Sequence, residues 1–466
     1  MSTEQTTAKE FRADPSVVQA LRARREREAA MSKLLMAFIV AGLVFMLFPG
    51  TLLGVWNLLQ ISGRAQSGSI SPSWLQAHGH AQVFGWVGSF LLGIGFYSIP
   101  KLRERATRVI RAAWVSWALW TLGVGVRWVA TVYRWEWRAL VPAGGMMEFL
   151  ALCIFFVVVS QHKPKDSRST LEPWVWVVMS ATIGFLLSLG ANLIESVGVA
   201  LRGVDPAFPR DFDQRYLVLL GWGFLVPFVW GFSAKWMRVF LGLRPVRPRF
   251  LLAAVILAFL GVGCAAAGSF GIATTLLLAA TISSVAAIRI FESSQQEPKT
   301  RGIHKSFPVF VRIAYGWLLI AASLGVAACQ WDTSGGFWGA SRHALTVGFV
   351  GTMILGVGQR ILPAFAGLRL LWSPRLMFVG LFLLTLGCTL RVCCEVLAYQ
   401  GYATWAWHFL PASALIELMA LSVFTVNILC TFVLQKSHAV NEPMRVGLPQ
   451  LAPAGNPRWN EQSFGV

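Results

Sequence analysis

Twelve apolar segments, each about as long as a membrane-crossing helix, follow one another along this chain of 466 residues. A helix needs about 20 apolar residues to cross a hydrocarbon core of roughly 30 Å. Hydrophobic residues make up 56% of the sequence and its mean hydropathy is +0.60, which is not typical of a soluble domain. The sequence therefore predicts an all-α membrane protein of twelve transmembrane helices in contact with a lipid bilayer. The predicted spans are residues 34–56, 77–99, 112–133, 139–160, 174–200, 215–241, 250–268, 271–290, 309–329, 338–362, 374–399 and 405–433.

The net charge of +19 is distributed by side of the membrane. Most of the 40 Lys and Arg residues lie before the first span, after the last one, or in the connections that follow even-numbered spans. The positive-inside rule then places both termini in the cytoplasm, so the charge indicates topology and nucleic acid is not expected as a partner. We predict a cytoplasmic tail over residues 1–33, a transmembrane domain over 34–433 and a second cytoplasmic tail over 434–466, with no removable signal peptide.

Four of the seven histidines lie within predicted spans. His78 and His80 are near the start of the second span, His343 near the start of the tenth and His408 near the start of the twelfth. Even-numbered spans begin on the outer side, so all four share one depth, where they could hold one cofactor. The simpler alternative is that each one binds a backbone carbonyl or a water near the interface. A histidine within a span nevertheless favours a functional role.

The spacing of the paired histidines constrains what they can bind. Residues two apart on a regular helix diverge by roughly 160°, so His78 and His80 cannot ligate the same atom. Two facing helices can supply an axial pair of histidines to a haem, and neutral imidazole binds iron and copper alike. We therefore predict that His343 and one of the pair ligate a haem. His80 is preferred because it lies deeper, which leaves His78 and His408 for a second metal or a supporting role.

Three arginines toward the same outer side, Arg127, Arg342 and Arg391, are candidates to bind the propionates of such a haem. Arg391 has an alternative partner in Glu395, four residues further along the same helix. Glu148 and Glu417 lie in other spans without an obvious partner in the sequence.

Two blocks of sequence resemble a known family. Residues 77–102, AHGHAQVFGWVGSFLLGIGFYSIPKL, and residues 342–367, RHALTVGFVGTMILGVGQRILPAFAG, are similar to the two best-marked helices of the NnrS family. These are twelve-span bacterial proteins related to the haem-copper oxidase large subunit and associated with nitric oxide resistance. The resemblance implies a bundle like oxidase subunit I in a bacterial inner membrane, b-type haem and copper as cofactors, and nitric oxide as a ligand. It carries His78, His80 and His343 over as haem or copper ligands.

The sequence departs from this pattern in ways that limit the activity it predicts. Ala81 stands where the family often has an acidic residue. Unlike in the oxidases, the sixth span has no histidine, so a binuclear centre that reduces oxygen is not expected. Whether the protein is an enzyme is left open, as are a redox partner and a homo-oligomer. The alternatives are an electron-transfer or oxidase-like redox subunit and, from a different class, a solute transporter with histidines as proton-coupled gates.

Overall fold

The computed structural model describes residues 15–64, 70–101, 107–160, 172–367 and 370–435, and within these ranges all regular secondary structure is helical. Twelve helical stretches are long and apolar enough to cross a membrane, and they coincide with the twelve predicted spans. The prediction of an all-α protein with twelve apolar helices is therefore confirmed. The tail predictions over residues 1–14 and 436–466 lie outside the described residues.

Eight spans are single helices, and the other four are interrupted by a π-helical segment. The single helices are α5 (Thr107–Tyr133), α6 (Trp137–Ser160), α7 (Pro173–Arg202), α10 (Pro248–Ala266), α11 (Phe270–Ile288), α12 (Phe307–Trp331), α15 (Pro374–Tyr399) and α16 (Ala406–Leu434). The first span is α1 (Pro15–Phe45), η1 (Met46–Leu52) and α2 (Leu53–Arg64), and the second is α3 (Pro72–His80), η3 (Ala81–Gly88) and α4 (Ser89–Lys101). The sixth span is α8 (Arg210–Val218), η4 (Leu219–Leu225) and α9 (Val226–Leu241), and the tenth is α13 (Gly336–His343), η5 (Ala344–Gly351) and α14 (Thr352–Phe365).

Proline and glycine mark many of the helix ends. Pro173 and Pro248 occupy the first turn of α7 and α10, where proline needs no hydrogen-bonded N–H. Gly203 and Gly242 end α7 and α9 with φ values of 70° and 66°, a left-handed conformation that glycine adopts without steric cost. These residues set where α7 and α10 begin and where α7 and α9 end.

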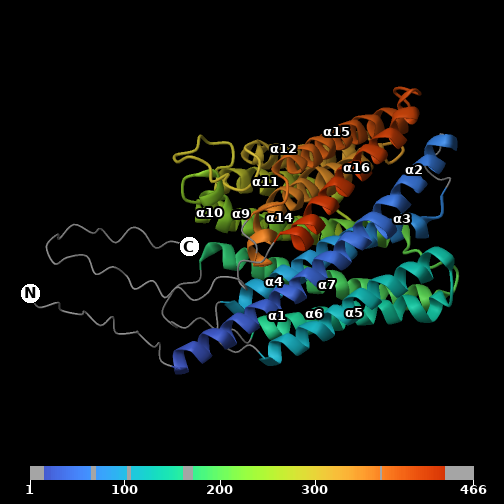
Figure 1. Cartoon of the computed structure of the whole chain (residues 1–466). Helices are drawn as coiled ribbons and strands as arrows, with labels where there is room; N and C mark the ends of the chain where they lie inside the picture. The colour runs from blue at the N-terminus through green and yellow to red at the C-terminus, as the bar shows by residue number, and fades with distance from the viewer. Residues whose placement is uncertain (1–14, 65–69, 102–106, 161–171, 368–369, 436–466) are drawn as a thin grey trace, which may run out of the picture.

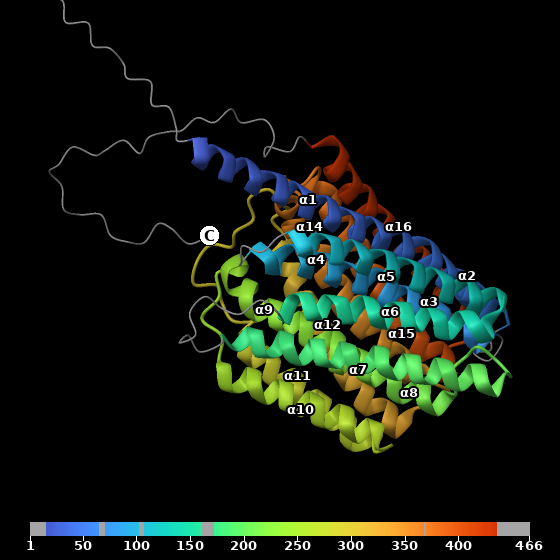
Figure 2. The ribbon, with the colours of Figure 1, turned by 90° about the horizontal axis from the view of Figure 1, so that it is seen from below.

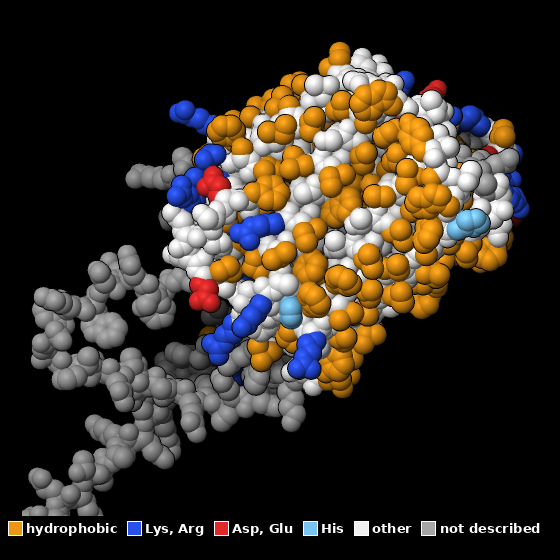
Figure 3. Space-filling view, turned by 90° about the horizontal axis from the view of Figure 1, so that it is seen from above, with side chains coloured by type: hydrophobic (Ala, Val, Ile, Leu, Met, Phe, Trp, Pro, Cys, Tyr) orange, Lys and Arg blue, Asp and Glu red, His pale blue; other side chains and the backbone are white. Residues whose placement is uncertain are grey.

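The helices form one elongated bundle in which α1 begins and α16 ends at the same end (Figures 1 and 2). We call this the basic end, because the connection from α9 to α10 there carries Arg244 and Arg247. The opposite end, where α3 and α13 begin, is called the far end. Apolar side chains cover the middle of the face in Figure 3, with Lys and Arg mainly toward its ends, as expected for contact with lipid.

Every fourth span, starting from the second, lies inside the bundle. The second, sixth and tenth spans are 72%, 67% and 78% buried over their most apolar windows, and no other span exceeds 56%. All three carry a π-helical segment, which begins directly after His80, Val218 and His343 respectively. Single π-helical turns are frequent at functional sites. His80 and His343 thus occupy equivalent positions on two of three inner helices.

The sidedness of the bundle can be measured directly. The positive-inside rule predicts that a reporter fused at Arg244, at the basic end, reads as cytoplasmic. A reporter fused at Gly203, at the far end, should read as periplasmic. A phosphatase and fluorescent-protein fusion pair at each position checks this, and the reversed pattern would place the histidines on the cytoplasmic side.

Candidate functional site

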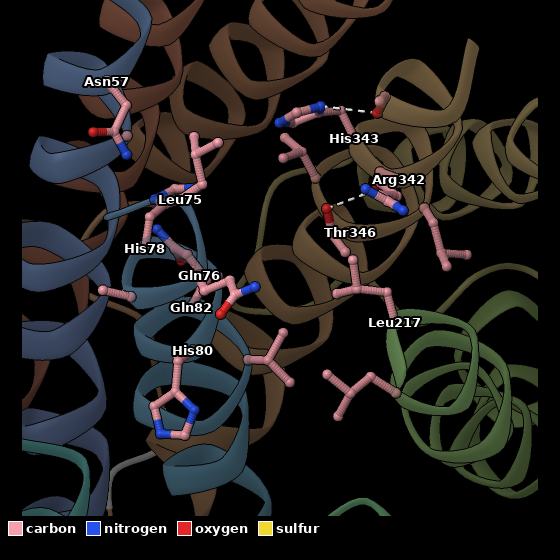
Figure 4. A pocket seen from close by; sticks show the side chains of 18 of the residues that line it. Asn57, Leu75, Gln76, His78, His80, Gln82, Leu217, Arg342, His343 and Thr346 are labelled. Carbon is pink, nitrogen blue, oxygen red and sulfur yellow. Dashed lines mark hydrogen bonds between the residues drawn. The ribbon is translucent and has the colours of Figure 1, made fainter. Parts of the chain in front are cut away.

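A cavity of about 570 Å³ opens among the inner spans in the far half of the bundle. Its walls also include residues of the first, eleventh and twelfth spans. Figure 4 shows part of its lining. Six of the seven predicted site residues line it, namely His78, His80, His343, Arg127, Arg342 and Arg391. His408 is not among the lining residues and its side chain is exposed, so the structure does not bring it to the cavity.

His78 lies against the first span. Its Nδ1 is 2.9 Å from the carbonyl oxygen of Gly50, which can only accept a hydrogen bond. Nδ1 therefore carries the proton, and Nε2 keeps a lone pair. The ring lies over Gly54, where a Cβ atom would be 2.6 Å from Cε1 of the imidazole. The imidazole of His78 can occupy this position only because residue 54 has no Cβ.

His343 is held in a similar way from the tenth span. Its Nδ1 is 3.0 Å from the carbonyl oxygen of Gly339 and 2.9 Å from Oε2 of Glu395 on α15. Both are acceptors, so Nδ1 is again the protonated nitrogen and Nε2 has the lone pair. In Figure 4, His78 and His343 approach the same space from helices on opposite sides.

His80 points elsewhere, as the spacing of the two histidines predicts. Its Nε2 is 2.9 Å from Oε1 of Glu148 on α6, and its ring contacts Phe84 with centroids 4.8 Å apart. In Figure 4, His80 extends away from His78. The carboxylate that lacked a partner in the sequence is therefore an acceptor for His80.

Arg127 is bound to protein groups that the sequence reasoning did not identify. It is 7% exposed, and its Nη1 donates to Oδ1 of Asn192 at 2.6 Å and to Oγ of Ser196 at 2.7 Å. Asn192 in turn donates to the hydroxyl of Tyr216 at 2.9 Å. The available signal was the polar pair Asn192 and Ser196, four residues apart in an otherwise apolar span.

The guanidinium of Arg391 uses only some of its N–H donors in hydrogen bonds. Its Nε is 3.4 Å from Oε2 of Glu395, so the two ends of the predicted i,i+4 pair do meet. Nη2 donates to Nε2 of His343 over 3.4 Å, but Nε and Nη1 make no hydrogen bond although they are buried. Oε1 of Glu417, which also borders the cavity, is a buried acceptor without a partner. Buried unpaired polar atoms are uncommon and favour a missing ligand or water.

No group of three or more His, Cys, Asp or Glu side chains suited to a metal ion occurs among the residues that the structure describes. A haem needs only one or two protein ligands to its iron, so this arrangement is compatible with a haem.

Comparison with known proteins gives one family. A model described as a domain of unknown function (DUF8744) matches residues 192–430, which include His343, Arg342 and Arg391 but not His78, His80 or Arg127. No curated protein matches the chain.

Proposed function

We propose that this chain, which belongs to the DUF8744 family because that model covers more than half of it, is an integral membrane protein that binds a haem between α3 and α13. The observation that carries the proposal is the matched pair of His78 and His343. Each hydrogen-bonds a backbone carbonyl through Nδ1, lines the same cavity and keeps the Nε2 lone pair. Histidines that bind metals are commonly oriented in this way.

The cavity supports this proposal by its size and its lining. Its volume of about 570 Å³ lies within the range of about 300–1,000 Å³ typical of small-molecule and cofactor sites. Leucine and valine side chains from several spans supply an apolar wall, for example Leu345, Val347 and Leu421. A bound haem would supply an iron centre for electron transfer or for binding a diatomic ligand.

Two of the three predicted arginines are suited to the anionic edge of the haem. Arg342 and Arg391 line the cavity, and the buried Nη1 of Arg391 makes no hydrogen bond, while its Nε lies 3.4 Å from Oε2 of Glu395. Arg391 also faces Nε2 of His343, so its guanidinium has to turn away when that nitrogen ligates a metal. We assign Arg127 a structural role instead, because Asn192 and Ser196 accept hydrogen bonds from its Nη1.

The contacts favour His78 over His80 as the partner of His343, unlike the preference based on depth. His78 and His343 have the same tautomer and approach the same space in Figure 4, whereas His80 extends away from His78, with its Nε2 at Glu148. We assign His80 to the pair with Glu148, which packs the second span against α6.

The proposal includes a helix bundle like that of oxidase subunit I and nitric oxide as the ligand of the haem. Three inner helices at every fourth position support a likeness to oxidase subunit I, and the similarity of residues 77–102 and 342–367 to NnrS proteins favours nitric oxide as the ligand. A bacterial inner membrane is proposed on the same grounds. Copper stays a prediction of the resemblance.

An optical spectrum of the purified protein tests the proposal. Protein from cells supplied with iron and a haem precursor should be coloured, show b-type bands after dithionite and give a pyridine haemochrome. A colourless preparation from such cells would exclude haem binding.

Gly54→Ala should lower haem content without changing any proposed ligand. The new Cβ would be 2.6 Å from Cε1 of His78, so the imidazole has to leave its position over α2. Changes in groups that orient a metal ligand typically cost about 10–100-fold in affinity, and we expect a loss in that range. Haem content per protein is the measurement. Gly63→Ala on the same helix is the control, since a Cβ there meets nothing within 4 Å and haem should be retained.

A second candidate function follows from the buried N–H groups of Arg391 that make no hydrogen bond. They could bind a small carboxylate, as a solute carrier would. In that case haem-free protein should gain thermal stability with a carboxylate, and Arg391→Gln should abolish the gain. If the wild-type protein carries haem and the haem-free protein shows no such stabilisation, the carboxylate site is rejected and the haem proposal remains.

A further inference from the structure

A second, smaller cavity lies on the axis of the bundle, toward the basic end. Its volume is about 90 Å³, and residues of the second, sixth and tenth spans alone line it. Ser233 is the one hydroxyl-bearing residue in this lining; the rest are aliphatic or aromatic residues, methionine and a glycine. None of the lining residues is fully exposed, but several of them, such as Leu91, Val229 and Trp236, are half-buried, so the cavity is partly open. We call this cavity the axial chamber.

Three residues separate the axial chamber from the large cavity. Val87, Leu225 and Val350 line both, and each comes from a different inner span. Each is also the seventh residue of its π-helical segment, counted from the start of η3, η4 and η5. The three inner helices therefore each contribute the residue at the same position of the π-helical segment, and together Val87, Leu225 and Val350 form an apolar ring between the two cavities.

The chemistry of the chamber restricts what it can hold. Water in a cavity needs two to four polar partners, and the side chains of this lining offer only the hydroxyl of Ser233 and the indole N–H of Trp236. Empty apolar cavities in proteins stay dry and take up apolar molecules such as xenon or benzene. A charged or strongly polar molecule would lose its hydration without compensation.

We infer that the axial chamber is a binding site for a small, uncharged, apolar molecule of about the size of xenon or a diatomic gas. The site lies one side-chain layer from the large cavity, behind the ring of Val87, Leu225 and Val350. This inference goes beyond the proposed function, because it depends on the packing of three helices and does not require a bound haem. A lipid acyl chain is the competing occupant.

Xenon-129 NMR of the full chain in nanodiscs tests the inference. Wild-type protein should show a saturable xenon signal that empty nanodiscs lack. Val229→Phe fills the chamber from α9 and should abolish that signal, and Ile354→Phe should do the same from α14. Val239→Phe is the matched control, because this residue on the same helix is 47% exposed; it should retain the signal.

Each outcome decides the matter. A wild-type protein without a saturable signal would overturn the inference, as would a signal that persists in folded Val229→Phe and Ile354→Phe proteins. A copurified lipid that blocks xenon would assign the chamber to an acyl chain and also overturn it. The xenon signal does not depend on haem. The xenon result can therefore be interpreted even if the protein proves not to bind haem.

Discussion

Replacing His343 by alanine is expected to abolish haem binding. His343 presents Nε2 to the cavity from the tenth span, while Gly339 and Glu395 hold its Nδ1. Loss of groups that merely orient a metal ligand costs about 10–100-fold in affinity, so loss of a ligand should cost at least that much. Haem per protein, measured as pyridine haemochrome after purification, gives the result.

His408→Ala is the control for this substitution. His408 is exposed and does not line the cavity, so this variant should keep the wild-type haem content. Equal haem content in His343→Ala and wild type would remove the proposed ligand pair. A parallel loss in both variants would point to a general folding defect rather than to ligation.

Replacing Arg127 by leucine is expected to lower the free energy of unfolding by about 2–4 kcal/mol. The guanidinium is buried and donates to both Asn192 and Ser196, so the substitution leaves these side chains without a donor inside the bundle. The loss should come with a smaller effect on haem affinity, because Arg127 is assigned to structure. Unfolding in mixed micelles with increasing SDS measures it.

Arg202→Leu provides the comparison for a surface arginine. Arg202 pairs with Glu195, and its side chain is 50% exposed. An exposed ion pair contributes about 0–1 kcal/mol, so this variant should remain close to wild type. If both leucine variants lost the same amount, or if Arg127→Leu lost none, the structural role of Arg127 would be wrong.

Hydrophobic length predicted the membrane spans because the bilayer imposes it on every helix separately. All twelve spans agree with the structure, including the short break between α10 and α11. Periodicity also predicted that His78 and His80 diverge, since that angle is set within one helix. They bind different neighbours, Gly50 and Glu148.

The identity of those neighbours could not be predicted, because it depends on how each helix is rotated against the next. His408 has a suitable depth in the sequence, but its side chain is exposed and does not reach the cavity. Arg127 lines the cavity, as a propionate partner would, but the sequence did not identify Asn192 and Ser196 on α7, which accept hydrogen bonds from its Nη1. The π-helical segments add a further change in rotation that hydropathy does not encode.

The central claim is that His78 and His343 together hold a haem, and haem content of His78→Ala beside His80→Ala tests it most directly. The account predicts near-complete loss in His78→Ala, whose Nε2 lone pair is available to a metal. It predicts retention of most haem in His80→Ala, because that imidazole extends away from His78 toward Glu148. Retention in His78→Ala together with loss in His80→Ala would contradict it.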